Sequence, residues 1–283
     1  MKVELRGLFK MRIMSRSSSS SHSSVSSVTF YGRKRFGPKE KAEINNKTYP
    51  IVVEMSKIEE AESRWYTERK AEYPSVTSIL KLTMPTDSSL RLSKWIRKKE
   101  HELGVKGALQ LRDDIRQRGL TIHKYLSDHF LGRLRDEDIP RNLLGYWKSF
   151  KPVLNGISEP KAVETAVVHR KLHYAGTFDC VAKYRDHLCL IDWKTSDKPR
   201  RTLRDCYDFP IQAVAYAGAV NVDKSYPFKV DRALVVVGYQ NGSLADVHLM
   251  SRMQCEGYWE KWLERLNSYR NIKFEEKFDD STL

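Results

Sequence analysis

The chain has 283 residues, of which 40% are hydrophobic and 11% aromatic; this is enough apolar surface for a packed core and excludes a wholly disordered protein. No stretch approaches the roughly 18 consecutive apolar residues of a membrane span, so no membrane association is expected. The formal net charge of +14 favours a polyanionic partner such as nucleic acid.

Half of this charge lies in residues 1–36, which carry eight basic residues and one acidic residue. The segment combines a serine-rich run over residues 15–27 with scattered apolar side chains, a composition typical of a mitochondrial transit peptide. A disordered basic tail that binds nucleic acid is the alternative. We therefore expect residues 1–36 to direct the protein to the mitochondrial matrix, and residues 37–72 to form a linker with at most one short strand.

The apolar pattern becomes regular from Tyr73 onward, first with the period of helices and then with that of strands. Helices are expected at residues 74–80, 88–103, 107–131 and around 147–153. Strands follow at 162–169, 176–184 and 187–193, then a helix at 210–220, strands at 232–239 and 246–250, and a closing helix at 252–270. This order predicts an α/β (α+β) fold over residues 73–271, with a central mixed sheet flanked by helices, an N-terminal helical extension and a C-terminal tail at 272–283.

The four cysteines form no Cys-x-x-Cys pair and have no metal-ligand spacing with histidine. We expect them to be free thiols in the core, which argues against a zinc site or an iron–sulfur cluster. They are Cys180, Cys189, Cys206 and Cys255.

Two aspartates in the strand region are matched in register. A hairpin with a two-residue turn at Arg185 and Asp186 places Asp179 directly opposite Asp192, with the two Cβ atoms about 4.5–5.5 Å apart. The apolar residues around them indicate a buried hairpin, where two unpaired carboxylates would repel each other. A divalent cation, Mg²⁺ or Mn²⁺, would relieve that repulsion.

Lys194 follows Asp192 by two residues and therefore shares its face of the strand. Trp193 points the other way, although its carbonyl oxygen can still reach a metal. Two carboxylates with a metal and a lysine beside them favour phosphodiester hydrolysis, in which Lys194 orients or activates water. Alternatively, an Asp-x-Lys triplet at the end of a strand is only a surface ion pair.

The segment Gly176-Thr-Phe-Asp179, followed by Ile191-Asp-Trp-Lys-Thr195, resembles the core of the PD-(D/E)xK nucleases of the RecB-like branch, and so implies a restriction-endonuclease-like fold. Three further marks of that branch are present: Gly119 with His123, Glu164, and Gln212 with Tyr216. The resemblance implies that His123 binds metal and that Glu164, Gln212 and Tyr216 support the site. We expect the glycine at 119 to let its helix approach the sheet. Phe178 replaces the proline of the family's name, and the four-cysteine cluster of some relatives is absent from the sequence.

A closer resemblance, over roughly residues 70–270, is to the family of mitochondrial genome maintenance exonucleases. It is carried by Pro74-Ser-Val-Thr77, Leu188–Ser196 with Lys198-Pro199, Gln212–Tyr216 and Tyr258–Leu263. The resemblance implies a monomeric, metal-dependent enzyme that cleaves single-stranded DNA from its ends and trims flaps during mitochondrial DNA replication. It also implies a helical gate over the site and other replication proteins as partners.

Basic residues near the site are candidates for binding the DNA backbone. Lys198, Arg200 and Arg201 follow the strand expected at 187–193, while Lys94, Trp95 and Lys98 lie on the helix expected at 88–103, which is rich in basic residues. A solvated charged surface with Trp95 in the core is the alternative. Ser75 and Thr77 either contact a phosphate or cap a helix, and elementary chemistry favours the cap.

The sequence thus predicts a metal-dependent exonuclease for single-stranded DNA, with Asp179, Asp192 and Lys194 as catalytic residues. The metal ligands would be His123, Asp179, Asp192 and the carbonyl of Trp193. The alternatives are a nuclease of the same fold that acts on duplex ends or RNA, an inactive nucleic-acid-binding module, and a basic mitochondrial RNA-binding factor.

Overall fold

The computed structural model describes residues 56–59, 64–68 and 71–279. The segment predicted to be a transit peptide lies outside these residues. Within them, no helix combines the length and the apolar character that crossing a membrane requires.

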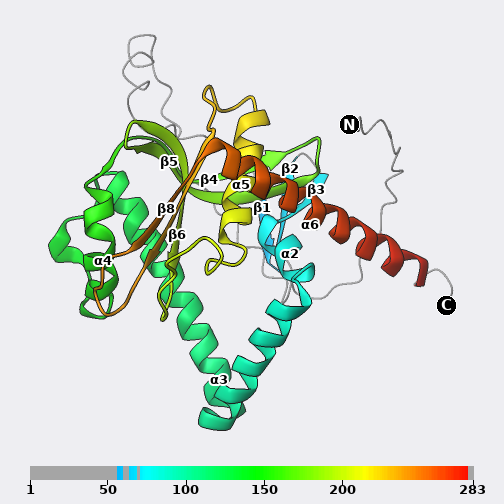
Figure 1. Cartoon of the computed structure of the whole chain (residues 1–283), viewed down its shortest axis with the longest axis horizontal. Helices are drawn as coiled ribbons and strands as arrows, with labels where there is room; N and C mark the ends of the chain where they lie inside the picture. The colour runs from blue at the N-terminus through cyan, green and yellow to red at the C-terminus, as the bar shows by residue number, and fades with distance from the viewer. Residues whose placement is uncertain (1–55, 60–63, 69–70, 280–283) are drawn as a thin grey trace.

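Two β-sheets of unequal size form the framework (Figure 1). The smaller one is antiparallel and contains β1 (Ser56–Glu59), β2 (Arg64–Glu68) and β3 (Ala71–Pro74). The expectation of at most one short strand before residue 73 is therefore wrong. Charged residues interrupt the apolar alternation in these strands, and the sheet is held instead by contacts such as the buried ring of Tyr66, whose hydroxyl lies 3.1 Å from Oγ1 of Thr177.

The larger sheet has five strands in the order β4-β5-β6-β7-β8. It consists of β4 (Ile157–His169), β5 (Tyr174–Tyr184), β6 (His187–Thr195), β7 (Arg232–Gly238) and β8 (Asp246–Met250). Only β6 and β7 run parallel, and α5 (Phe209–Val222) connects them, as a parallel pair requires. The predicted mixed sheet flanked by helices is confirmed.

Helices cover both faces of this sheet. On one face, α2 (Val76–Leu82), α5 and α6 (Arg252–Asp279) pack on sheet residues such as Leu190 and Val235. On the other face, α4 (Leu144–Leu154) and the C-terminal part of α3 (Thr86–Phe130) pack on Ile191 and Val236. The short 3₁₀ turns η2 (Asp136–Asp138) and η3 (Arg141–Leu143) connect α3 to α4. The result is a three-layer arrangement with an apolar core on each side of the sheet.

The helix α3 bends sharply at Gly104, whose φ of 71° and ψ of 166° are not helical. The bend produces two arms that meet at a tip well below the sheet (Figure 1). The first arm, residues 86–103, follows α2 through Pro85, and the second, residues 105–130, returns to the sheet. Both arms were predicted from the sequence as separate helices, and Gly104 is the residue that divides them because it tolerates positive φ.

The C-terminal helix is longer than the sequence indicated. The expected helix at 252–270 continues to Asp279, so the tail predicted from residue 272 is helical in its first part. Its buried residues, among them Trp262 and Leu266, lie before residue 270, and Figure 1 shows the last turns projecting beyond the core. The apolar periodicity therefore stops where packing stops, while the helix itself continues.

Candidate active site

The β5–β6 hairpin has the predicted register. Cys180 pairs with Ile191 and Tyr184 with His187, and the turn residues Arg185 and Asp186 have φ values of 48° and 64°, as a two-residue turn of this type requires. Extending the same register by one residue places Asp179 opposite Asp192. The predicted hairpin register is confirmed for residues 180–184 and 187–191, and the facing of the two carboxylates follows from it by extension.

A third carboxylate continues this row into β4. Val163 pairs with Cys180 and Thr165 with Phe178, so Glu164 lies opposite Asp179. Glu164 has a φ of 45°, in the left-handed region that a side-chain-bearing residue rarely adopts, at a cost of roughly 1–2 kcal/mol. Glu164, Asp179 and Asp192 thus form one line across three neighbouring strands, which we call the acidic row.

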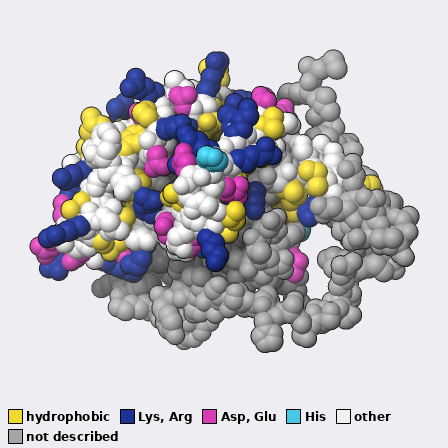
Figure 2. Space-filling view, turned by 90° about the horizontal axis from the view of Figure 1, so that it is seen from below, with side chains coloured by type: hydrophobic (Ala, Val, Ile, Leu, Met, Phe, Trp, Pro, Cys, Tyr) yellow, Lys and Arg dark blue, Asp and Glu magenta, His cyan; other side chains and the backbone are white. Residues whose placement is uncertain are grey.

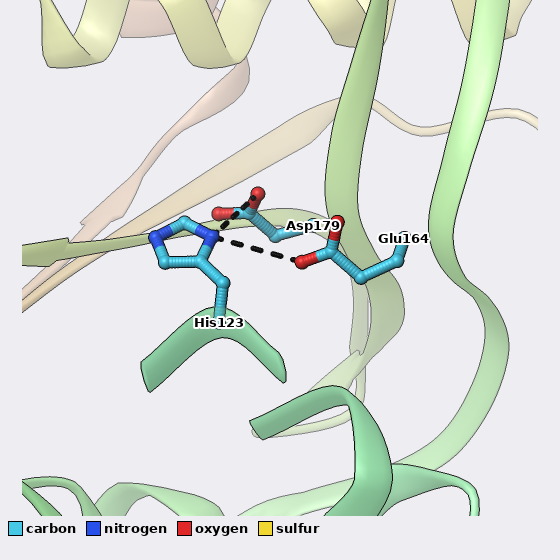
Figure 3. A group of neighbouring side chains, drawn as sticks. All are labelled: His123, Glu164 and Asp179. Atoms are coloured by element: carbon cyan, nitrogen blue, oxygen red, sulfur yellow. Dashed lines mark ion pairs between the residues drawn. The ribbon is translucent and has the colours of Figure 1, made fainter. Parts of the chain in front are cut away.

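His123, on the second arm of α3, faces Glu164 and Asp179 of the acidic row (Figure 3). Its Nδ1 lies 3.2 Å from Oδ1 of Asp179 and 3.6 Å from Oε1 of Glu164. His123, Glu164 and Asp179 each offer a ligand atom within 4.8 Å of the other two, which is a spacing suited to one metal ion. Glu164, predicted only to support the site, therefore lies where it could bind the same ion as the predicted ligands His123 and Asp179.

Electrostatic coupling governs the protonation of these three groups. Burial by itself would lower the pKa of His123, but the carboxylates of Asp179 and Glu164 outweigh it and raise the pKa to about 10. Burial would raise the pKa of Asp179, yet His123, Lys194 and the amide of Trp193 hold it below its usual value. Burial dominates at Glu164, whose pKa is raised. Without metal, the imidazole is thus a cation that partly neutralises the row.

Asp192 is fully buried and forms an ion pair with Lys194. Its Oδ2 lies 2.6 Å from Nζ of the lysine in this ion pair, and neither carboxylate oxygen accepts a well-aligned hydrogen bond from the described part of the chain. Burial, reinforced by Asp179, raises the pKa of Asp192 to about 6 despite the lysine. Burial works to lower the pKa of Lys194, but Asp192 and Asp179 more than compensate, so this pKa is raised and the side chain is an ammonium ion.

These residues fit a divalent metal ion. The donor set consists of carboxylate oxygens and one imidazole nitrogen, which suits Mn²⁺ and, for the oxygens, Mg²⁺. A buried carboxylate oxygen that lacks a partner, Oδ1 of Asp192, is costly unless something else satisfies it. His123, Glu164, Asp179 and Asp192 would hold the ion, whose positive charge would relieve the repulsion within the acidic row.

Trp193 points away from the acidic row, as its place between Asp192 and Lys194 predicts. Its indole is almost fully buried against Phe130 and Phe150, with ring centroids 6.0 and 5.6 Å away. Its backbone N–H donates a 2.7 Å hydrogen bond to Oδ2 of Asp179 and so fixes that carboxylate in place. A role for its carbonyl as a metal ligand stays a prediction.

Gln212 and Tyr216 contact each other at the side of the site, as their spacing on one helix face predicts. Nε2 of Gln212 lies 3.2 Å from the hydroxyl of Tyr216. The ring of Tyr216 packs on Gly176, where a Cβ atom would lie 2.4 Å from Cε1 of the ring. The glycine that opens the Gly-Thr-Phe-Asp segment is therefore required for close packing between β5 and α5.

Gly119 lies one helical turn before His123, but the predicted reason for it is wrong. A Cβ atom at this position would have no atom within 4 Å, so the glycine is not needed for contact between the helix and the sheet. It instead leaves open space on the helix face that carries His123.

The predicted DNA-binding residues differ in whether they contact other parts of the protein or are exposed to solvent. Arg200 is engaged within its loop: its Nε donates to Oγ of Ser196 at 3.1 Å, a terminal nitrogen donates to the carbonyl of Asp205 at 2.9 Å, and the guanidinium lies over Tyr207. Lys198 and Arg201 are exposed on the same loop. Arg200 therefore stabilises the loop that presents these two cations.

The first arm of α3 presents Lys94 and Lys98 to solvent, while Trp95 is half-buried. Lys98 lies 3.7 Å from Glu102, so part of its charge is compensated. Ser75 is buried and caps α2, accepting a 3.0 Å hydrogen bond from the amide of Ser78; its Oγ also lies 3.0 Å from that of Thr77. The cap is thus the observed role of Ser75.

The surface seen from below carries many Lys and Arg side chains with acidic ones among them (Figure 2).

The four cysteines are free, and three of them are buried, as expected from their spacing.

Comparison with known proteins identifies the relatives of this chain. It is 41% identical over 205 residues to mitochondrial genome maintenance exonuclease 1 of Xenopus tropicalis, 43% identical over 202 residues to that of Mus musculus, and 39% identical over 204 residues to that of Homo sapiens. The chain is a relative of the mitochondrial genome maintenance exonucleases. This similarity confirms the resemblance predicted from the motifs.

The alignments with these exonucleases cover 69–72% of this chain and 58–59% of the relatives. The chain therefore spans less than two thirds of the length of the proteins that it matches. No protein-family model matches the chain.

Proposed function

We propose that this protein is a metal-dependent exonuclease that hydrolyses single-stranded DNA from its ends, and that it trims flaps and ends during the maintenance of mitochondrial DNA. The observation that carries the proposal is the acidic row, in which the buried Asp192 forms an ion pair with Lys194 while its carboxylate oxygens accept no well-aligned hydrogen bond from the described part of the chain. Relatives named as mitochondrial genome maintenance exonucleases support the reaction class and the location.

The residues of the site divide the chemistry among themselves. His123, Glu164, Asp179 and Asp192 would hold Mg²⁺ or Mn²⁺, and a bound ion of this kind supplies a Lewis acid that polarises the phosphate and lowers the pKa of water. Lys194 stays protonated, so it donates hydrogen bonds, orients the attacking water and stabilises the negative charge that develops on the phosphate. The buried apolar surroundings strengthen each of these interactions.

The residues on the two arms of α3 favour single-stranded DNA as the substrate. His123 lies on the second arm, while the first arm carries Lys94 and Lys98 with the half-buried Trp95. Exposed cations with an aromatic ring nearby are typical of surfaces that bind backbone phosphates and stack bases without reading sequence. We propose that these arms form the helical gate, with Lys198 and Arg201 as further phosphate contacts.

Cleavage by wild type and Lys194→Met tests the proposed chemistry. On an oligonucleotide in Mg²⁺, the variant is expected to lose at least about 100-fold in kcat because it removes the positive charge that stabilises the transition state. Its affinity for Mn²⁺ should persist, since Lys194 is not a ligand. Lys198→Met is the matched control, with kcat retained and KM raised. Cleavage at the wild-type rate by Lys194→Met would refute the assignment.

Substrates with a blocked 5′ or 3′ end test the exonuclease mode. Cleavage should require a free end on single-stranded DNA, and a matched duplex and RNA of the same sequence should be poorer substrates. Preferred cleavage of the duplex or the RNA would favour the alternative nuclease, and binding without any cleavage would favour an inactive binding module.

A further inference from the structure

We infer that Phe209 is a positioning residue for the catalytic Lys194, holding its ammonium group toward Asp192 through the face of its ring. Nζ of Lys194 lies 5.4 Å from the centroid of the Phe209 ring and 2.6 Å from Oδ2 of Asp192. The inference rests on the proposed function, because it assigns a role in the orientation of that same lysine.

The contact satisfies the requirements of a cation–π interaction. A lysine nitrogen within about 6 Å of a ring centroid is attracted by the negative face of the ring, and this attraction is strongest where water is excluded. Lys194 keeps only 15% of its side-chain surface exposed. The carboxylate and the ring therefore restrict an otherwise flexible four-carbon side chain from two directions.

The position of Phe209 is itself fixed by the start of α5. Phe209 is the first residue of this helix, its amide donates to the carbonyl of Cys206 at 3.0 Å, and Pro210 follows it with a restricted φ. On the other side, both carboxylate oxygens of Asp208 lie 3.0 Å from the guanidinium of Arg265 on α6.

Arg265 extends this anchoring to the base of the first arm of α3. It also donates 2.7 Å to Oγ1 of Thr83 and to the carbonyl of Leu80, at the end of α2. One partly buried guanidinium thus joins α2, the N-cap of α5 and α6 beside Phe209. A ring held this firmly is suited to orienting a neighbouring side chain and has little freedom to follow it.

Substitution of Phe209 with fluorinated phenylalanines separates this role from mere packing. Fluorine withdraws charge from the ring face with little change in shape, so kcat should fall stepwise with the number of fluorine atoms while KM and the melting temperature stay unchanged. Phe209→Leu should lower kcat roughly 3- to 30-fold, and Phe209→Tyr should restore it. Phe228→Leu is the matched control, because Phe228 is another partly buried ring packed on the same core.

A flat response of kcat to fluorination would overturn the inference, as would an equal loss in Phe209→Leu and Phe228→Leu. If Phe209→Leu fails to fold, the fluorinated series alone decides. The outcome is distinct from that of the proposed function, because activity that vanishes in Lys194→Met but ignores fluorination leaves the function intact and removes only the role of Phe209.

Discussion

Replacing Asp192 with asparagine should stabilise the metal-free protein while abolishing its activity. Asp192 is fully buried, and its pKa rises from an ordinary 3.8 to about 6 because burial disfavours the charged form. This rise corresponds to at most about 3 kcal/mol of folding free energy at neutral pH. Asparagine has nearly the same shape and needs no neutralising partner, so Asp192→Asn should recover that free energy in the absence of metal.

The stabilisation expected from Asp192→Asn should depend on pH in one direction. A carboxyl group whose pKa is higher in the folded state destabilises the fold fully above that pKa, here about 6, and not at all below the unfolded value. The advantage of Asp192→Asn should therefore be largest above pH 6 and should disappear as the pH falls toward 4. In a domain of this size, the melting temperature should rise by roughly 5–10 °C at neutral pH.

Thermal unfolding followed by circular dichroism in excess EDTA is the assay, with Asp197→Asn as an exposed control. Titration with Mn²⁺ should then raise the melting temperature of the wild type and have much less effect on Asp192→Asn. A variant less stable than the wild type in EDTA at pH 7.5, or an advantage unchanged at pH 4.5, would refute the reasoning that Asp192 is strained without metal.

Two further predictions concern His123 and Gly176. Because His123 has a pKa of about 10 without metal, Mn²⁺ binding at pH 7.5 should release about one proton. In calorimetry, the binding heat should therefore depend on the ionisation enthalpy of the buffer. His123→Asn should remove that dependence, and its persistence in the variant would contradict the assignment of a protonated imidazole. Gly176→Ala should cost roughly 1–3 kcal/mol in urea unfolding because its Cβ would overlap the ring of Tyr216, whereas Gly119→Ala, in open space, should be neutral or stabilising; equal effects would contradict the packing argument.

The central hairpin was predictable from the sequence because its determinants are local. The turn at Arg185 and Asp186 sets the register, and the alternation of apolar residues sets the faces, so the opposition of Asp179 and Asp192 follows from counting. The helix spacing of Gln212 and Tyr216 gave their contact in the same way.

Other features depend on contacts that no local pattern encodes. The position of Glu164 beside His123 and Asp179 depends on a left-handed residue within a strand, and a glutamate gives no signal for such a conformation. The charge of Arg200 predicts a phosphate contact, whereas its contacts with Ser196, Asp205 and Tyr207 are recognisable only in three dimensions. The sheet β1–β3 was missed for a similar reason, since its apolar alternation is broken by charges.

The acidic row also determines which sequence changes this site can survive over evolutionary time. Its three carboxylates come from consecutive antiparallel strands of one meander, residues 157–195, and their alignment depends on the strand register and on the left-handed backbone of Glu164. Insertions in the connecting turns that preserve the pairing of the strands would leave all three aligned, whereas the loss of one residue inside β5 would turn half of that strand over and separate Asp179 from one of its neighbours. The meander is thus inherited as a unit: its turns can change in length only where the strand register is kept, and its strands cannot change in length.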